Sequence, residues 1–200
     1  MARGLRVIAG SAGGLRLVAP KGARTRPTTD RVKESVFASL GPDTLEGATV
    51  LDLYAGSGAL AIEALSRGAG RALLVDDDPV AIDAIERNLG HTQLAERARA
   101  RRADVADFLR GPLPSGAPFD VVFLDPPYDT PDDEVTRVLG LLVSDGWLAP
   151  PATVVVERPA GGTLAWPPGL ALARERSYGD TVVLFASPRS TATTDPAGPS

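Results

Sequence analysis

The sequence contains no cysteine and a single histidine, His91, among its 200 residues. Without thiols the chain cannot form disulfides, use a thiolate nucleophile or bind zinc through cysteine. One histidine cannot build a histidine metal cluster, so we expect no bound metal. No apolar run approaches the roughly 20 residues that are needed to span a bilayer. These absences exclude disulfide-stapled proteins, proteins that bind zinc through cysteine and membrane-spanning proteins.

The composition is that of one domain with a full core, because 44% of the residues are hydrophobic. The chain begins with basic residues, but charged and glycine residues interrupt any apolar stretch of a signal peptide. These are Arg6, Gly10, Gly13, Gly14 and Arg16. We therefore expect a cytoplasmic protein.

The net charge of −4 hides an asymmetry along the chain. Residues 1–34 hold eight basic and two acidic residues, a net charge of +6, while the remainder holds 13 basic and 23 acidic residues, a net charge of −10. A basic N-terminal segment on an otherwise acidic chain is typical of a protein that binds phosphates at one edge. Guanidinium groups suit phosphate because they donate in a planar bidentate fork. A solvated charged face is the alternative interpretation.

Hydrophobic periodicity predicts an α/β fold. We expect a hairpin over residues 5–18, and strands at residues 49–54, 71–75, 98–103, 120–124, 153–156, 170–176 and 181–186. We expect helices at residues 30–40, 58–67, 79–94 and 132–143, and a short one through Phe108. Alternating strands and helices require a parallel sheet with right-handed crossovers, and the last two strands add an antiparallel hairpin. We expect an N-terminal extension at residues 1–42, a main domain at 43–186 and a disordered tail at 187–200, whose small and polar residues cannot form a core.

The run Asp125-Pro126-Pro127-Tyr128 follows the apolar stretch 119–124 directly. Two prolines cannot continue a central strand, so the strand must end at Asp125. The quartet therefore lies at the carboxyl end of a strand, where open α/β sheets bind ligands. A carboxylate, backbone carbonyls and a stacking ring suit a flat base that carries an exocyclic amine.

A glycine-rich loop, Tyr54-Ala55-Gly56-Ser57-Gly58, joins the first core strand to its helix. Glycines let the backbone approach a ligand closely, and the helix that follows presents free N–H groups. The spacing fits dehydrogenases and methyltransferases equally well. Asp52, four residues before the first glycine, suits a positively charged ligand such as the ammonium of S-adenosylmethionine, and suits a pyrophosphate poorly.

Acidic residues recur at strand ends, and we expect Asp52, Asp76, Asp104 and Asp125 to project at one edge of the sheet. Asp76 is placed to hold both ribose hydroxyls of a nucleotide, and Asp77 competes for that role. Asp104 is placed to accept from an adenine amine, while Val105 offers its N–H to the ring.

Three segments of the chain together resemble the RsmD-type rRNA guanine-N2 methyltransferases of bacteria. The segments are residues 26–34 (RPTTDRVKE), the loop DLYAGSGALAIEALSRGA and the quartet DPPY. The likeness runs from about Arg6 to Ala186. It implies a class I, Rossmann-like methyltransferase fold with a seven-stranded, mostly parallel sheet and an antiparallel C-terminal hairpin, extended by a small N-terminal hairpin and helix.

The resemblance also implies methyl transfer from S-adenosylmethionine to the exocyclic amine of one guanine in 16S rRNA, within an assembling 30S subunit, by a monomer. It implies that Asp52, Gly56 and Gly58 bind the cofactor, Asp76 its ribose, Asp104 its adenine, and Asp125 to Tyr128 the base. Thr28 lies in a segment that is expected to fold over the methionine end of the cofactor. The arginines expected to contact RNA are Arg3, Arg6, Arg16, Arg24, Arg26 and Arg31.

Three other functions remain open from the residues alone. An N6-adenine DNA methyltransferase would use DPPY equally well, but such enzymes usually carry a separate recognition region. A non-catalytic RNA-binding assembly factor on the same fold is disfavoured by the four intact acids. A nicotinamide dehydrogenase is disfavoured by Asp52 and DPPY.

Overall fold

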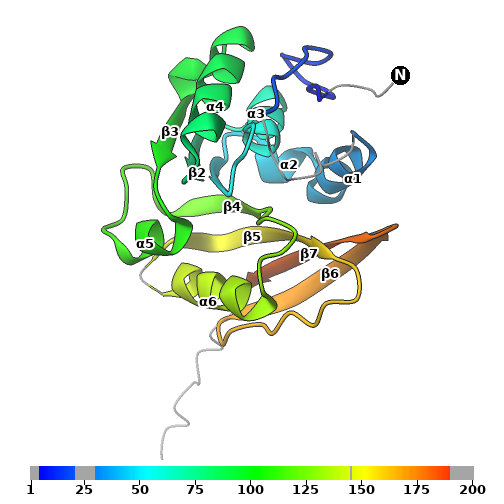
Figure 1. Cartoon of the computed structure of the whole chain (residues 1–200), viewed down its shortest axis with the longest axis vertical. Helices are drawn as coiled ribbons and strands as arrows, with labels where there is room; N and C mark the ends of the chain where they lie inside the picture. The colour runs from blue at the N-terminus through cyan, green and yellow to red at the C-terminus, as the bar shows by residue number, and fades with distance from the viewer. Residues whose placement is uncertain (1–4, 21–29, 145, 190–200) are drawn as a thin grey trace, which may run out of the picture.

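A seven-stranded sheet of order β3-β2-β1-β4-β5-β7-β6 forms the centre of the computed structural model, which describes residues 5–20, 30–144 and 146–189 (Figure 1). The strands are β1 (Thr49–Leu53), β2 (Arg71–Asp76), β3 (Ala98–Arg102), β4 (Phe119–Leu124), β5 (Leu148–Pro159), β6 (Leu170–Tyr178) and β7 (Thr181–Pro188). The first five run parallel, and β7 pairs antiparallel with both β5 and β6. The expected topology, with its C-terminal hairpin, is confirmed.

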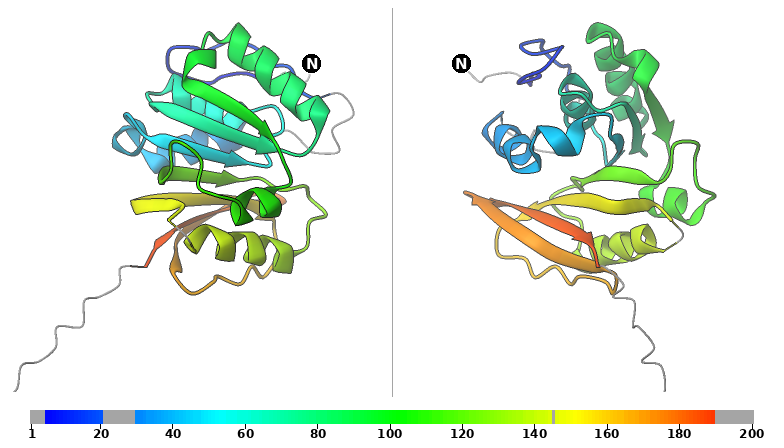
Figure 2. Two further views of the ribbon diagram at one scale, coloured as in Figure 1. Left: turned by 90° about the vertical axis from the view of Figure 1, so that its left-hand side faces the viewer. Right: turned by 180° about the vertical axis from the view of Figure 1, so that it is seen from behind.

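Helices cover both faces of the sheet (Figure 2). They are α1 (Asp30–Leu40), α2 (Pro42–Leu45), α3 (Ala59–Ser66), α4 (Pro79–His91), the 3-10 turn η1 (Ala95–Arg97), α5 (Val105–Arg110) and α6 (Asp132–Val143). The apolar sides of α1, α3 and α4 pack on one face and those of α5 and α6 on the other. No helix among the described residues is long and apolar enough to cross a membrane.

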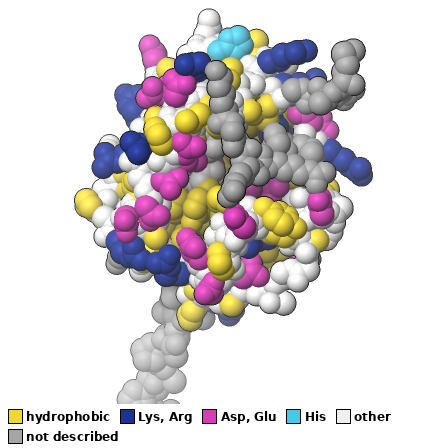
Figure 3. All heavy atoms as spheres, viewed as in Figure 1, with side chains coloured by type: hydrophobic (Ala, Val, Ile, Leu, Met, Phe, Trp, Pro, Cys, Tyr) yellow, Lys and Arg dark blue, Asp and Glu magenta, His cyan; other side chains and the backbone are white. Residues whose placement is uncertain are grey.

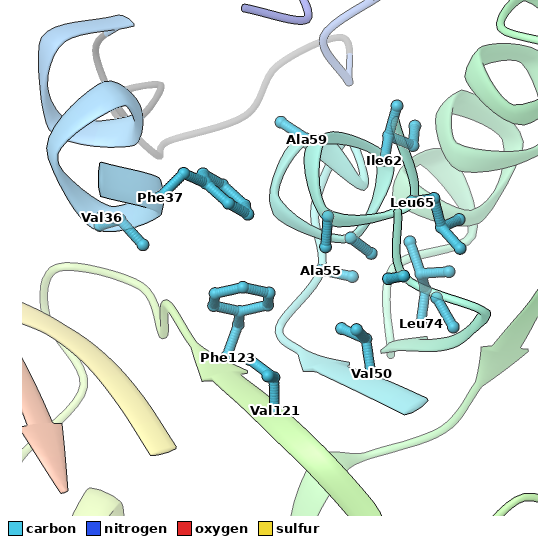
Figure 4. Packing of buried hydrophobic residues seen from close by; sticks show 14 of the residues in the cluster. Val36, Phe37, Val50, Ala55, Ala59, Ile62, Leu65, Leu74, Val121 and Phe123 are labelled. Atoms are coloured by element: carbon cyan, nitrogen blue, oxygen red, sulfur yellow. The ribbon is translucent and has the colours of Figure 1, made fainter. Parts of the chain in front are cut away.

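The central strands β1 and β4 are buried on both faces, which is why their sequences are almost continuously apolar. Phe123, at the carboxyl end of β4, meets Phe37 of α1 with 5.8 Å between ring centroids. Figure 4 shows the two rings facing one another between helix and sheet. Helix α1 is thereby fixed above the strand that leads into DPPY.

The C-terminal third of the chain differs from the expected boundaries. Strand β5 runs from Leu148 to Pro159 instead of 153–156, and a register shift in its pairing with β4 accommodates Pro150 and Pro151. Strand β7 runs to Pro188, and the Arg189 N–H donates to the Gly169 carbonyl at 2.8 Å. Residues 187–189 thus belong to the fold rather than to the expected tail, whose remainder, 190–200, lies outside the described residues. The short helix α2 was not expected.

The N-terminal segment 5–18 folds back on itself, as expected for a hairpin, although only one antiparallel bridge forms, between Arg6 and Arg16. It docks on α3 through Glu63, whose fully buried carboxylate accepts the N–H groups of Ile8 at 2.7 Å and Ala9 at 3.1 Å. Ser66, one turn further along α3, accepts the Ala12 N–H at 2.9 Å. The N-terminal segment therefore shares the core of the sheet.

Gly10 provides a test of this docking. A Cβ at Gly10 would lie 1.8 Å from the Ser66 carbonyl oxygen, and the backbone φ is +84°. Gly14 has the same kind of φ, +85°, but nothing lies within 4 Å of its Cβ position. Gly14→Ala should therefore cost only backbone strain, about 1–3 kcal/mol, whereas Gly10→Ala should cost clearly more. Urea unfolding of the two variants measures the difference, and equal losses would mean that segment 5–18 does not pack on α3.

Candidate active site

Four carboxylates gather at the carboxyl edge of the parallel strands. Asp52 lies within β1, Asp76 ends β2, Asp104 follows β3 and Asp125 follows β4. These strands are neighbours in the order β3-β2-β1-β4, so the expectation of one acidic edge is confirmed. In α/β sheets of this kind, that edge is where ligands bind.

The loop between β1 and α3 follows a tightly constrained path. Tyr54, Gly56 and Gly58 all have positive φ, at 60°, 55° and 75°. A Cβ at Gly58 would lie 2.9 Å from Leu74 Cδ2, so only glycine fits there without displacement. A non-glycine residue at positive φ, such as Tyr54, is strained, and such strain is concentrated at ligand sites. The backbone of this loop can therefore come into close contact with a ligand at this edge of the sheet.

Asp52 is almost completely buried, with 1% of its surface exposed. Its carboxylate accepts the N–H of Ala61, in the first turn of α3, at 3.1 Å. Burial raises the pKa of Asp52 well above its usual value, and the negative charges of Asp125 and Asp76 raise it further. A positively charged ligand at this edge would favour the ionised carboxylate.

Asp76 holds the glycine loop in place. One carboxylate oxygen accepts the Gly56 N–H at 2.8 Å and the other accepts the Asp78 N–H at 3.0 Å. Burial raises the pKa of Asp76. Each oxygen keeps a second lone pair, so both can still accept a hydroxyl. Asp78 caps α4 by accepting from Val80, and the Asp77 carbonyl accepts from Arg102 at 3.1 Å.

Asp104 serves as the N-cap of α5. Its side chain accepts the Asp107 N–H at 2.9 Å, and Val105, the first residue of the helix, is buried. The predicted contacts of Asp104 and Val105 with adenine remain a prediction.

Tyr54 connects the glycine loop to the helices of the opposite face. Its half-buried ring packs against the core beneath α5 and α6. Burial, followed by the charges of Glu134 and Asp104, raises the pKa of Tyr54 to about 12. The phenol is therefore neutral at physiological pH.

The quartet after β4 begins within the fold and ends at the surface. Asp125 is half-buried, Pro126 is buried, Pro127 is exposed, and Tyr128 is 70% exposed. The Thr130 N–H donates to the Pro127 carbonyl at 2.9 Å, which closes a turn with Tyr128 at its corner. An exposed tyrosine ring held on a turn is available for stacking.

The predicted RNA-binding arginines fall into two groups. Arg16 and Arg31 are exposed, whereas Arg6 pairs with Asp30 at the start of α1, Nε to Oδ2, at 2.9 Å. The sequence did not reveal this partner of Arg6. Four other predicted site residues lie outside the described residues: Arg3, Arg24, Arg26 and Thr28.

Asn88 of α4 was not predicted, yet it connects the N-terminal segment to the glycine loop. Its amide oxygen accepts the Val18 N–H at 2.8 Å, and its amide nitrogen donates to the carbonyls of Val18 and Ser57, both at 2.9 Å. Its place on the buried side of α4, between Ile85 and Leu89, was the available signal. Glu63, a lone charge in the apolar helix ALAIEALS, was a similar signal.

Charge is distributed unevenly over the surface. Figure 3 shows acidic side chains across much of the face seen there, and basic side chains mostly nearer its outline.

Within the described ranges, no group of three or more histidine, cysteine, aspartate or glutamate side chains could hold a metal ion.

Comparison with known proteins identifies the family. The family model described as "Conserved hypothetical protein 95" matches residues 5–187. The chain is 38% identical to "Putative rRNA methyltransferase YlbH" of Bacillus subtilis, over 92% of this chain and 100% of that protein. It is also 38% identical to "Ribosomal RNA small subunit methyltransferase D" of Escherichia coli, over 88% of this chain and 85% of that protein. The solved structure "Putative methyltransferase yhhF from Escherichia coli" is similar, with a TM-score of 0.80 and 36% identity over 92% of this chain and 97% of that one. The chain therefore belongs to the Conserved hypothetical protein 95 family, which is the family of the RsmD-type methyltransferases.

Proposed function

We propose that this protein transfers a methyl group from S-adenosylmethionine to the exocyclic N2 of one guanine in small-subunit rRNA. The observation that carries the proposal is the DPPY turn at the end of β4, beside a glycine loop and three further strand-end acids. The name of the E. coli relative, a small-subunit rRNA methyltransferase, supports the substrate class.

The residues at the edge fit S-adenosylmethionine, which supplies a methyl group on a positively charged sulfur. Asp52 would offset the positive charge of the ligand, and the loop of Gly56 and Gly58 would leave room for its close approach. Asp76 keeps free lone pairs for ribose hydroxyls, as an acid at the second strand does in nucleotide folds. Asp104 would accept from the adenine amine.

Asp125 and its neighbours would prepare the guanine. The N2 lone pair is delocalised into the ring, which makes the amine a poor nucleophile. Hydrogen bonds from the two amine hydrogens to the Asp125 carboxylate and the Pro126 carbonyl would favour a pyramidal nitrogen and expose the lone pair. After transfer, the excess proton leaves the nitrogen for Asp125 or for solvent. Tyr128 would stack on the base once it is unstacked from the RNA.

The exposed arginines of the N-terminal part would hold the RNA phosphates. Arg16→Ala and Arg31→Ala should each weaken RNA binding and flatten its salt dependence by about 0.7–0.9 units of log–log slope per lost phosphate contact. Arg87→Ala is the matched control, because Arg87 is an exposed arginine on α4 that pairs with Asp83. Salt titrations of binding measure the slopes. Slopes unchanged from wild type would place the RNA elsewhere.

Further parts of the proposal concern the form of the substrate, the oligomeric state and the place in the cell. We propose that the substrate is 16S rRNA within the assembling 30S subunit, that the enzyme acts as a monomer, and that it works in the cytoplasm, where ribosomes assemble. The test is an assay with labelled S-adenosylmethionine on small-subunit particles, on protein-free rRNA and on DNA, followed by identification of the modified nucleoside. We expect N2-methylguanosine from the particles. N6-methyladenine from DNA would replace the proposal with the adenine-specific alternative.

A further inference from the structure

A buried arginine, Arg158, contacts the end of the loop that joins DPPY to α6. Strand β5 pairs with β4 up to Leu124 and Val156, and β5 then continues to Pro159 while β4 gives way to the loop. Arg158 lies two residues beyond Val156, in the part of β5 that extends past the last paired residue of β4. Arg158 is buried, with only 6% of its surface exposed. The loop from β4 to α6 passes beside the end of β5 (Figure 1).

Arg158 contacts the far end of that loop through two neighbouring residues. Its Nη2 donates to the Thr130 carbonyl at 2.6 Å and to Asp132 Oδ1 at 2.9 Å, and its Nε donates to the same Oδ1 at 3.1 Å. The other Asp132 oxygen accepts the Thr163 N–H at 3.1 Å. Asp132 is the first residue of α6, so the same contacts also fix the beginning of this helix.

These contacts restrain the residues that would face the base. Thr130 ends the turn that begins at Pro127, so the turn is held at one end by Arg158 and at the other by the stiff proline pair after β4. Tyr128 lies at the corner of this turn and is mostly exposed.

The chemistry of the pair favours a positioning role over simple stabilisation. A buried ion pair is weak evidence for stability, because apolar residues of the same volume often stabilise as well or better. In addition, Nη1 of Arg158 is buried and has no hydrogen-bond partner among the described residues, which is a cost to the fold. An apolar pair at these two positions could not supply the directional hydrogen bonds that Arg158 makes to Thr130 and Asp132.

We infer that Arg158, with Asp132 as its partner, is a positioning residue that holds the DPPY turn in the geometry needed for methyl transfer. The inference rests on the proposed function for its catalytic readout. Arg158 itself does not touch the reacting atoms. Loss of the contacts of Arg158 with Thr130 and Asp132 should displace Asp125 and Tyr128 relative to the base. Small misplacements of this kind can cost about 100-fold in rate.

Three variants test the inference. Arg158→Met removes the donors at similar volume, Asp132→Asn removes the charge of the partner, and Arg158→Lys keeps the charge but cannot contact both acceptors in the same way. Arg97→Met is the matched control, because Arg97 of η1 also donates to two backbone carbonyls, those of Ala69 and Leu65, away from the loop. For each variant, kcat, KM for small-subunit particles and the Kd of S-adenosylmethionine are measured. Hydrogen–deuterium exchange of the peptide covering residues 125–131 is measured in parallel.

We expect Arg158→Met and Asp132→Asn to lower kcat by about 10- to 100-fold with little change in cofactor affinity, and to speed exchange in residues 125–131. Arg158→Lys should recover part of kcat, and Arg97→Met should leave kcat and this exchange as in wild type. Either normal kcat or normal exchange in the Arg158→Met and Asp132→Asn variants would overturn the inference. Exchange does not depend on the substrate, so the two proposals can fail separately. A wild-type protein that fails to methylate rRNA would refute the proposed function. Unchanged exchange in the variants would refute the positioning role of Arg158.

Discussion

Asp125→Ala should nearly abolish methyl transfer, by about 10²- to 10⁴-fold, while the affinity for S-adenosylmethionine stays within a few fold of wild type. The reason is that different acids at the edge of the sheet are expected to contact the base and the cofactor. Asp125 follows β4 and leads into the turn of residues 127–130, whereas the glycine loop is held by Asp76 at the end of β2. Single-turnover kinetics on small-subunit particles measures the first effect, and calorimetry measures the second.

A matched control separates the position of Asp125 from the loss of a negative charge near the site. Asp133 is an exposed acid in the first turn of α6, and its carboxylate accepts the N–H of Glu134 at 2.9 Å. Asp133→Ala should keep near-normal turnover. If Asp125→Ala instead lost its affinity for S-adenosylmethionine, Asp125 would be a cofactor ligand and the base would have to be held by other residues.

Asp52→Asn should weaken the binding of S-adenosylmethionine by at least about tenfold, because the positive charge of the ligand then lacks its buried counter-charge. Asparagine keeps the volume and can still accept the Ala61 N–H. Asp120→Asn is the control, because Asp120 lies near the opposite end of β4, where its carboxylate accepts the Thr49 N–H at 2.7 Å. Calorimetry of both variants measures the affinities, and an unchanged affinity in Asp52→Asn would remove Asp52 from the cofactor site.

The raised pKa of Asp52 predicts how binding depends on pH. Burial keeps part of the carboxyl protonated in the free protein above its usual pKa, and a cationic ligand favours the ionised form. Binding should therefore release protons, and affinity should rise as the pH rises through the raised pKa. Calorimetry in buffers of different ionisation enthalpy counts the released protons. The Asp52→Asn variant should lose most of this release, and an equal release in the variant would assign it to another group.

The stability of the free protein should show the opposite trend. Between the unfolded pKa, near 3.8, and the raised folded pKa of Asp52, the folded protein binds more protons than the unfolded chain. The free energy of unfolding contributed by this group therefore falls as the pH rises through that window. Asp76, whose pKa is also raised by burial, acts in the same direction.

The strand ends could be predicted from the sequence because each is marked by local chemistry. The diproline after Asp125 ends β4, and the glycines after Leu53 mark the turn into α3, so the acids beside them could be placed at one edge without coordinates. Periodicity likewise predicted α6 with the boundaries that the structure has. These signals lie within a few residues of the feature that they predict.

The contacts that hold the site together could not be predicted, because they join residues far apart in the chain. Glu63 binds the N–H groups of segment 5–18, Asn88 joins Val18 to Ser57, and Arg158 holds the turn after DPPY. A charged residue on an apolar helix or strand indicates that a partner exists, but only the fold identifies it. The sequence likewise did not reveal that Arg6 pairs with Asp30, 24 residues away, and the predicted RNA contact of Arg6 stays a prediction.

The central claim is methylation of guanine N2 in small-subunit rRNA, and the most direct test is to map methylated guanines in rRNA from a strain that lacks this protein. We expect one N2-methylguanosine of 16S rRNA to disappear, to return when the wild-type chain is supplied, and to stay absent with Asp125→Ala. An unchanged set of methylated guanines in the deletion strain would contradict the account.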